Sequence, residues 1–462
     1  MTEFRADNAV FDIAIIGGGA GGVLAAIHAL RQATARQRIA LIEPSANLAE
    51  GVAYATRHAE HLLNVPARGM SAFAGEPGDF LEHVLATDDS GASRDELSAR
   101  FVERRRYADY LRRRLAEARH ASKATLEVVH DHVEELDVPH DGAPMRLRLQ
   151  NGTTLQARAA VIAIGNRPKP LPARGVGALP ASKSLAAWDF DAIRRIDRDA
   201  GVCIVGSGLS MVDALLSLSA NGYRGALHVL SRHALLPLAH ATDPAVAEFD
   251  VSALHAQTLR QRLRSLREHS RIAVAAGLPW QAVLERLRPH GTALWQSLSK
   301  TEQRRFLRHA LRHWDVHRHR IAPQVHRQID AFRASGQLRL HRGRLRHVIA
   351  QGNCVRLGWQ AHDSGLREFD VDVVVNATGV ELRAQTLRST LLDGLLGHGL
   401  ARPGPHGIGI DTTAEGRVID AEGHAHPRLF ALGSLRIGSL WESIAIPELR
   451  VQAETIARVL RL

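Results

Sequence analysis

A short apolar strand, a glycine-rich turn and an apolar helix follow one another between Phe11 and Leu30. The turn reads Gly17-x-Gly19-x-x-Gly22. In this motif the first glycine permits a tight turn, the second lets the backbone approach a pyrophosphate, and the third allows close helix–strand packing. The helix that begins there directs unpaired N–H groups and its positive dipole end at phosphates. The stretch therefore predicts a Rossmann-like dinucleotide site.

An acidic residue after the next strand strengthens this prediction. The strand 39–43 ends in Glu43, about 20 residues beyond Gly22, where a carboxylate that binds ribose hydroxyls is expected. A plain glycine turn between a strand and a helix would not explain this acid.

The opening pattern recurs near the middle of the chain. An apolar strand leads into Gly206-x-Gly208 and another apolar helix, but Met211 stands at the third glycine position. The first two glycine roles are kept, so we expect a second nucleotide site with looser helix–strand packing. The following strand, 226–230, leads into Arg232 rather than an acid. An arginine there accommodates a 2′-phosphate, which favours NADPH while leaving NADH open.

Composition limits the class of protein. The 462 residues suffice for two or three domains, and 45% hydrophobic with 23% charged residues is ordinary for a globular protein. We find no apolar stretch long enough to cross a membrane and no secretion signal, so the cytoplasm is the expected compartment. The two cysteines, Cys203 and Cys354, indicate neither a disulfide framework nor a metal cluster.

The net charge of +11 raises the question of a nucleic-acid or membrane partner. The arginines and histidines are spread along the chain, and no nucleic-acid-binding module is visible. We therefore expect neither partner. A basic surface, or an interior that favours an anionic cofactor and substrate, explains the charge.

Two glycine fingerprints with later strands ending in Ala377-Thr378-Gly379 and Gly433-Ser434 resemble the two-dinucleotide-binding flavoproteins. Further stretches are similar to one bacterial family of FAD/NAD(P)-binding proteins, distantly related to N-hydroxylating and Baeyer–Villiger-type monooxygenases. These stretches read GVAYAT, HLLNVPARGMSAF, WDVHRHRIAP and WESIAIPELR. One branch that the chain resembles is the FAD-dependent urate hydroxylases.

The resemblance implies an α/β chain with two Rossmann-like domains. Residues 1–180 would start the FAD-binding domain, and 181–336 would form the NAD(P)H-binding domain with a mostly helical segment at 251–336. Residues 337–462 would return to the FAD-binding domain. Thr378, Gly379 and Gly433 would contact cofactor, and Ser434 would replace the aspartate that many relatives use for the ribityl chain.

The implied function is an FAD-dependent monooxygenase that uses NADH or NADPH and O2 through a C4a-(hydro)peroxyflavin. Urate, an anionic small molecule of purine catabolism, is the favoured substrate and would be hydroxylated to 5-hydroxyisourate. The alternatives are an N-hydroxylating or other FAD/NAD(P)H oxidoreductase of unknown substrate, and a non-catalytic flavin- or nucleotide-binding protein. A disulfide reductase would need a paired-cysteine motif, which is missing. The oligomeric state stays open, and a homo-oligomer is compatible.

Three further residues are candidates for the reaction site. Asn64 lies in an irregular loop, 51–80, and would either present its amide to the flavin edge or simply form a turn. Arg318 and Arg320 lie in a basic stretch that is either solvated or binds the anionic substrate. His317 and His319 share this stretch, but no Glu or Cys set accompanies them, and we predict no metal.

Overall fold

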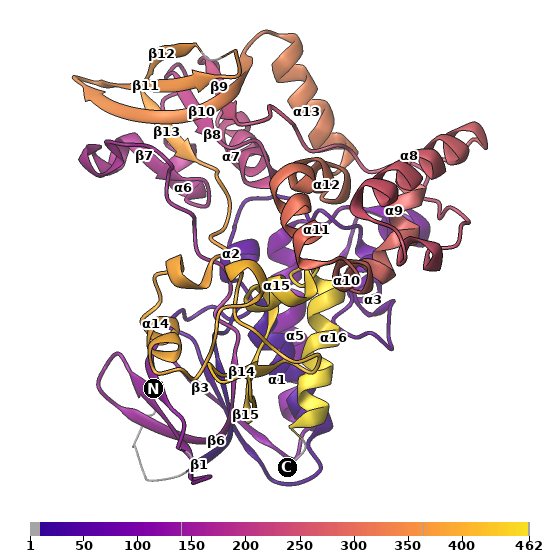
Figure 1. Ribbon diagram of the computed structural model, residues 1–462, viewed down its shortest axis with the longest axis vertical. Coiled ribbons are helices and arrows are strands. Elements are labelled where there is room, and N and C mark those ends of the chain that lie inside the picture. Colours follow the sequence, from indigo (N-terminus) through magenta and orange to yellow (C-terminus); the bar gives the residue numbers. More distant parts are fainter. Residues whose placement is uncertain (1–9, 140, 364, 461–462) are drawn as a thin grey trace. The chain divides into compact units, whose positions relative to one another are not determined.

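The chain forms two compact units, and Figure 1 shows their elements in a computed structural model that describes residues 10–139, 141–363 and 365–460. The first unit contains residues up to Arg57, Pro66–Arg167 and the chain from Leu382 onward. The second contains His58–Val65 and Pro168–Glu381. Each unit is built on one sheet.

The first unit is an α/β layer structure. Its strands are β1 (Val10–Ile16), β2 (Arg38–Ile42), β3 (Thr125–Val129), β4 (Val133–Asp137), β5 (Met145–Leu149), β6 (Thr154–Ile162), β14 (Arg417–Ile419) and β15 (Ala425–Ala431). Its helices are α1 (Ala20–Gln32), α2 (Gly51–Tyr54), α3 (Asp79–Thr87), α4 (Arg94–Ala99), α5 (Arg104–Ala121), α14 (Thr390–Gly397), α15 (Ile437–Leu440) and α16 (Ile446–Val459).

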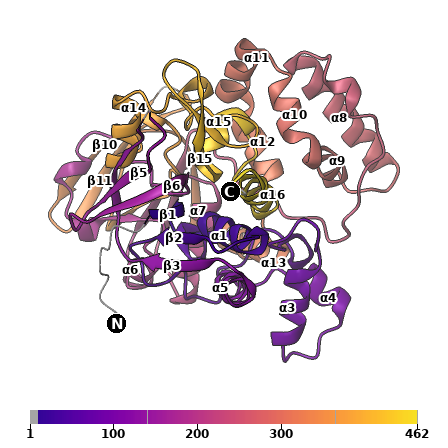
Figure 2. The same cartoon turned by 90° about the horizontal axis from the view of Figure 1, so that it is seen from below.

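The first sheet has the order β14-β15-β6-β1-β2-β3, with β4 and β5 attached beside β6. Strands β15, β6, β1, β2 and β3 are parallel. Helix α1 packs against both α5 and α16, as Figure 2 shows, while α14 packs near β4. Helix α1 also contacts β1, β2 and β3, and α14 shares one hydrophobic core with β1, β6 and the β4–β5 pair. Both faces of the parallel strands are therefore covered, which explains their nearly continuous apolar sequences.

The second unit has its own sheet, which is mixed. Its strands are β7 (Ser184–Ala186), β8 (Val202–Val205), β9 (Leu227–Ser231), β10 (Leu338–Gln351), β11 (Cys354–Ala361), β12 (Leu366–Val371) and β13 (Val373–Asn376). Its helices are α6 (Phe190–Arg194), α7 (Leu209–Ala220), α8 (Leu259–Ala275), α9 (Gln281–Leu287), α10 (Gly291–Gln296), α11 (Lys300–Arg305), α12 (Leu311–Arg318) and α13 (Pro323–Ala334).

The second sheet has the order β12-β11-β10-β9-β8-β13-β7. Strands β10, β9, β8, β13 and β7 are parallel, whereas β11 and β12 extend β10 as an antiparallel meander. The mostly helical segment between β9 and β10 matches the expectation for residues 251–336. The basic stretch that contains Arg318 is the end of helix α12.

The second unit begins at Pro168 rather than at 181, and the two compact units differ more widely from the predicted domain boundaries in two further places. The return to the first unit begins at Leu382 rather than at 337, because β10 pairs with β9 and its meander stays in the second sheet. Residues His58–Val65 join the second unit although both flanking segments belong to the first. Sequence patterns identify strands but not which sheet they enter, and this accounts for both differences.

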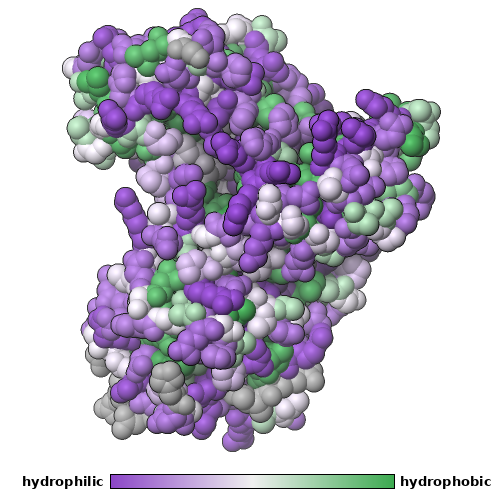
Figure 3. Space-filling view, viewed as in Figure 1, coloured by the Kyte–Doolittle hydropathy of each residue, from purple (hydrophilic) through white to green (hydrophobic). Residues whose placement is uncertain are grey.

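Hydrophilic residues dominate the face shown in Figure 3, with hydrophobic residues scattered between them. None of the helices in the described part of the chain combines the length and apolar character needed to cross a bilayer.

Steric limits on two glycines hold the first β–turn–α unit together. Gly17 has φ +106°, and a Cβ there would lie 2.5 Å from the Ala163 carbonyl oxygen. A Cβ at Gly22 would lie 1.8 Å from the Gly17 carbonyl oxygen. Both contacts are with backbone, which cannot move aside, so only glycine allows α1 to start this close to β1.

We expect Gly22→Ala to lower the free energy of unfolding by about 3 kcal/mol, because the added methyl must push α1 away from the turn. Denaturant unfolding of the protein would measure this change. Gly78→Ala is the matched control, since a Cβ at Gly78 meets nothing within 4 Å. Equal stability of the two variants would contradict the steric argument.

Candidate functional site

The glycine turn of the first unit lies at the carboxyl edge of its parallel strands. Gly19 is the residue that precedes α1, in an extended conformation. A Cβ at Gly19 would make only ordinary contacts, the nearest at 3.5 Å from the Gly51 Cα. The protein itself therefore does not require glycine here, in contrast to Gly17 and Gly22. The missing side chain leaves the backbone open to the close approach of a pyrophosphate, which stays a prediction.

Glu43 directly follows β2 and faces the same turn. Its Oε2 accepts a hydrogen bond from the Gly18 N–H at 2.7 Å, and its Oε1 accepts one from the Ser45 N–H at 3.0 Å. A carboxylate has about four lone-pair positions, so acceptor sites for two ribose hydroxyls remain. Glu43 thus has the position and chemistry predicted for a ribose ligand.

Gly433 and Ser434 lie at this same edge of the first sheet. Leu432, which precedes them, donates its N–H to the Ile162 carbonyl at 3.0 Å. Ser434 Oγ donates to the Gly165 carbonyl at 2.8 Å, and its lone pairs stay available to a ligand hydroxyl. The structure therefore brings the predicted cofactor residues of the first unit together, although the first glycine turn and Gly433 stand near opposite ends of the sequence.

A buried polar network that sequence reasoning missed positions Gly433. Gln452 Oε1 accepts from the Gly433 N–H at 3.1 Å, and Ser443 Oγ donates to the Gly433 carbonyl at 3.0 Å. Arg436 is 1% exposed and donates to the Thr413 and Ala414 carbonyls; burial lowers its pKa to about 10. A buried cation held mainly by backbone carbonyls has no sequence pattern by which it could be found.

The second glycine turn repeats the geometry of the first. Gly206 has φ +116°, and a Cβ there would lie 2.0 Å from the Ala377 carbonyl oxygen. Gly208 precedes α7, and the nearest atom to a Cβ there is in the flexible Arg312 side chain at 3.7 Å. Ser207 Oγ donates to the Leu235 carbonyl at 2.7 Å, which holds the turn against the segment after β9.

A cluster of arginines surrounds this second turn. Burial lowers the pKa of the Arg232 guanidinium, and the positive charges of Arg312 and Arg344 lower it further. Arg342 is paired in register with Ser231, directly before Arg232. Arg312 contacts Asp315 at 2.8 Å, whereas Arg232, Arg342 and Arg344 make no ion pair with the described residues. Several guanidinium groups held this close together favour the binding of a multiply charged anion such as a phosphate.

Sequence reasoning found Arg232 but missed Arg342 and Arg344. The alternating arginines of β10 were visible in the sequence, but the pairing of β10 with β9 was not. This pairing places Arg342 beside Ser231, and Arg344 lies near enough to Arg232 for its charge to act on that side chain.

Thr378 and Gly379 follow β13 and lie in the second unit. Thr378 Oγ1 is 2.7 Å from Asn376 Oδ1, and Asn376 Nδ2 donates to the Lys169 carbonyl at 2.8 Å. The Lys169 N–H in turn donates to the Gly379 carbonyl at 3.0 Å. These residues thus tie the start of the second unit to the segment after β13. Their contact with a cofactor stays a prediction.

Two of the three predicted reaction-site residues, Asn64 and Arg320, lie beside His240 in the second unit, and the charge of the third, Arg318, acts on Arg320. His240 Nε2 is 2.9 Å from the Asn64 carbonyl oxygen, and the positive charge of Arg320 acts on the imidazole. Burial, the largest effect, and the Arg320 charge lower the pKa of His240 to about 4. Arg320 forms an ion pair with Glu285 and is 4% exposed.

The charge of this His240 cluster is net positive. Burial opposes ionisation of Glu285, but the charges of Arg320, Arg288 and Arg318 bring its pKa below the ordinary value. Arg320 is therefore engaged with an internal acid rather than exposed to solvent, which sequence reasoning did not foresee. The described residues contain no group of three or more His, Cys, Asp or Glu side chains that could hold a metal ion.

In each of the two sheets a glycine turn follows a parallel strand, β1 in the first and β8 in the second. This arrangement matches the fold of two-dinucleotide-binding flavoprotein structures. Residues 14–167 match the family model of FAD-NAD(P)-binding proteins. This segment contains the first glycine turn, Glu43 and β6. No curated protein sequence matches the chain significantly.

Solved structures share the fold along nearly the whole chain. Ornithine hydroxylase (PvdA) from Pseudomonas aeruginosa is 16% identical with a TM-score of 0.66, covering 98% of this chain and 99% of its own. The ornithine N-hydroxylase KtzI from Kutzneria sp. 744, described with reduced FAD, NADP+ and L-ornithine, is 15% identical with a TM-score of 0.64 and the same coverage.

Bacillithiol disulfide reductase Bdr (YpdA) from Bacillus cereus is 14% identical with a TM-score of 0.55, covering 98% and 99% of the two chains. At these identities the likeness establishes the fold alone.

We expect Gly19→Ala to weaken FAD binding at least about tenfold while leaving the unfolding free energy of the apoprotein nearly unchanged. The extended backbone at Gly19 accepts a Cβ, but that methyl group would occupy the space where the pyrophosphate approaches. Flavin fluorescence titration and denaturant unfolding measure the two effects. Retention of FAD with wild-type affinity by the Gly19→Ala variant would refute the assignment of this turn.

His240 should make the protein sensitive to acid. Its folded-state pKa of about 4 lies below the ordinary 6.5, so the unfolded chain binds the proton first and stability falls as pH drops from 6.5 towards 4. The loss should reach up to about 3 kcal/mol. We expect His240→Gln to flatten the pH profile of thermal unfolding, whereas His424→Gln, at a side chain that is 76% exposed, should not.

Proposed function

We propose that this chain is an FAD- and NADPH-dependent monooxygenase that N-hydroxylates a small amine bearing a carboxylate. The observation that carries the proposal is the pair of glycine turns with opposite charges beside them, Glu43 in the first unit and the arginines around Arg232 in the second. A carboxylate suits ribose hydroxyls, and an arginine cluster suits a 2′-phosphate.

In the proposed arrangement the first unit holds FAD. Gly17, Gly19 and Gly22 shape the turn, and the start of α1 faces the pyrophosphate. Glu43 accepts hydrogen bonds from the ribose hydroxyls, and Ser434 contacts the ribityl chain. When bound, the flavin supplies hydride acceptance and oxygen activation, and the protein supplies position and charge. The contact of Asn64 with the flavin edge stays a prediction.

Monooxygenases and a disulfide reductase share this fold. The cysteines of this chain favour a monooxygenase over a disulfide reductase. Disulfide reduction by a flavoprotein needs two neighbouring thiols. This chain has two cysteines in all; Cys203 is buried on β8 and Cys354 lies on β11, and both are free. Burial raises the pKa of the Cys203 thiol well above its ordinary value, so it is a poor nucleophile.

Amine N-hydroxylation has better support than urate hydroxylation. The similar ornithine hydroxylases act on an amino acid, and no comparison points to urate. The net positive His240 cluster, with Arg288, Arg318 and Arg320 around Glu285, favours a substrate that carries a carboxylate as well as an amine. Urate is an anion too, and it therefore stays in the test as the second candidate.

The decisive experiment follows NADPH oxidation by the FAD-loaded protein with L-ornithine, L-lysine, putrescine or urate. It measures hydroxylamine, hydrogen peroxide and urate absorbance together. We expect an amino acid to accelerate oxidation and to yield hydroxylamine, and putrescine, which lacks the carboxylate, to be at least about tenfold poorer. Urate consumption with little peroxide would instead establish urate hydroxylation. Slow oxidation that yields only peroxide with every compound would refute both substrates.

Nicotinamide choice provides a second test. We expect Arg232→Ala to raise the KM for NADPH about tenfold or more while changing the KM for NADH little, because only NADPH places a 2′-phosphate in the arginine cluster. Steady-state kinetics with both nucleotides measure this. Arg224→Ala is the control, since Arg224 is exposed and paired with Asp199. An equal effect of Arg232→Ala on both nucleotides would contradict the assignment.

A further inference from the structure

A cavity of about 630 Å³ in the first unit belongs to none of the sites described above. It lies between α5, the edge strand β3 and the segment that follows Glu43. Ligand cavities of this size accommodate small organic molecules. The lining residues are Ala46, Leu48, Arg112, Leu115, Ala116, Arg119, His120, Leu126 and Val128.

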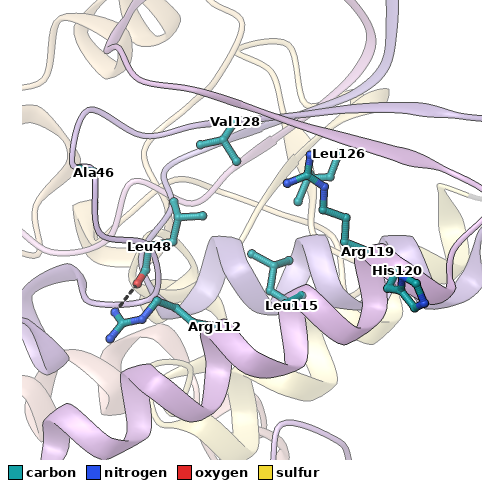
Figure 4. Close-up of a pocket in the computed structure, with 9 residues that line it drawn as sticks. Ala46, Leu48, Arg112, Leu115, Arg119, His120, Leu126 and Val128 are labelled. Atoms are coloured by element: carbon teal, nitrogen blue, oxygen red, sulfur yellow. Dashed lines mark hydrogen bonds between the residues drawn. The ribbon is translucent and has the colours of Figure 1, made fainter. Parts of the chain in front are cut away.

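Six of the nine lining residues are apolar, and they come from three different elements. Figure 4 shows Leu48, Leu115, Leu126 and Val128 converging from the segment after β2, from α5 and from β3. Strand β3 is the last strand at its end of the main strand order, so no further strand among the described residues covers this side of the cavity. An apolar molecule seated here would remove hydrophobic surface from water, which favours binding.

The polar groups of the cavity are all basic, and no acidic residue of the described chain lines it. Arg112 is already engaged, since its Nη1 donates to the Leu48 carbonyl at 3.0 Å and its guanidinium pairs with Asp109 and Glu50. Arg119 and His120 are exposed and have no hydrogen-bond or ion-pair partner among the described residues. In Figure 4 the Arg119 side chain rises beside Leu126. A carboxylate at this position would gain a charge-assisted hydrogen bond.

Leu48 connects the cavity to the first glycine turn. Its Cδ2 lies 2.8 Å from where a Cβ on Gly18 would be, so its side chain packs directly beneath this residue. The next residue, Ala49, donates its N–H to the Gly18 carbonyl at 2.8 Å, and the Gly18 N–H is bound by Glu43. A molecule that displaces the Leu48 side chain would therefore also displace the Gly18 backbone, to which the Glu43 carboxylate is hydrogen-bonded.

We propose that this cavity binds an amphipathic monocarboxylate, with its apolar body against Leu48, Leu115 and Leu126 and its carboxylate at Arg119. The occupant is an effector whose binding changes the affinity of the first glycine turn for FAD. The link to FAD rests on the proposed function, whereas the binding of the carboxylate does not.

The test is calorimetric titration of the full-length protein with octanoate, and with octanol as the uncharged molecule of equal length. We expect Arg119→Gln to weaken octanoate binding about tenfold and octanol binding little. Ala116→Trp fills the cavity from an exposed position of α5 and should weaken both ligands. Arg113→Gln is the matched control on the same helix, because Arg113 pairs with Glu117 and does not line the cavity.

FAD titration of the apoprotein, with and without saturating octanoate, tests the effector role. We expect the FAD dissociation constant to shift about fivefold or more, with a reciprocal shift of the octanoate constant. An absence of octanoate binding, or equal binding by all variants, would overturn the site. Complete mutual exclusion of octanoate and FAD would overturn it as well, because the cavity would then be part of the flavin site. An unchanged FAD constant would overturn the effector role. None of these outcomes depends on amine turnover, so they are distinguishable from a failure of the proposed function.

Discussion

Close passage of a glycine turn past the end of a neighbouring strand is the constraint on which both units depend. In the first unit Gly17 lies against the Ala163 carbonyl, just beyond β6; in the second, Gly206 lies against the Ala377 carbonyl, just beyond β13. Each glycine has positive φ and no room for a Cβ. The same solution in two sheets brings a helix N-terminus to the carboxyl edge each time, which is where parallel α/β sheets bind ligands.

Charge then distinguishes two turns that are sterically alike. The first faces Glu43, held by backbone N–H groups, and the second faces Arg232 with Arg342 and Arg344 nearby. A carboxylate accepts hydrogen bonds from hydroxyls and repels phosphates, whereas a group of arginines attracts phosphates, so the two turns favour different ribose groups. This asymmetry underlies the proposed division between FAD and NADPH.

The segment His58–Val65 shows how polar contacts can decide where a loop belongs. His61 is fully buried, and its Nε2 lies 3.0 Å from Ser217 Oγ and 3.2 Å from the Asp213 carbonyl of α7. His58 pairs with Asp191 at 3.0 Å, and Asn64 is bound by His240. Through these bonds Asn64, which sequence reasoning placed in a loop after β2, becomes part of the cationic cluster of the second unit.

The sequence alone determined the local features: both glycine turns, the strands and helices around them, Glu43, Arg232 and the helical segment before β10. These follow from short-range rules, since a turn with positive φ needs glycine and an apolar run of strand length forms a buried strand. Only the tertiary structure decided that β10 joins β9 and brings Arg342 and Arg344 to the second turn, that Arg320 pairs with Glu285, and that Arg119 borders an apolar cavity. Each of these depends on pairing between segments far apart in the chain, and the energy of such pairing is set by packing and charge in three dimensions rather than by any pattern along the sequence.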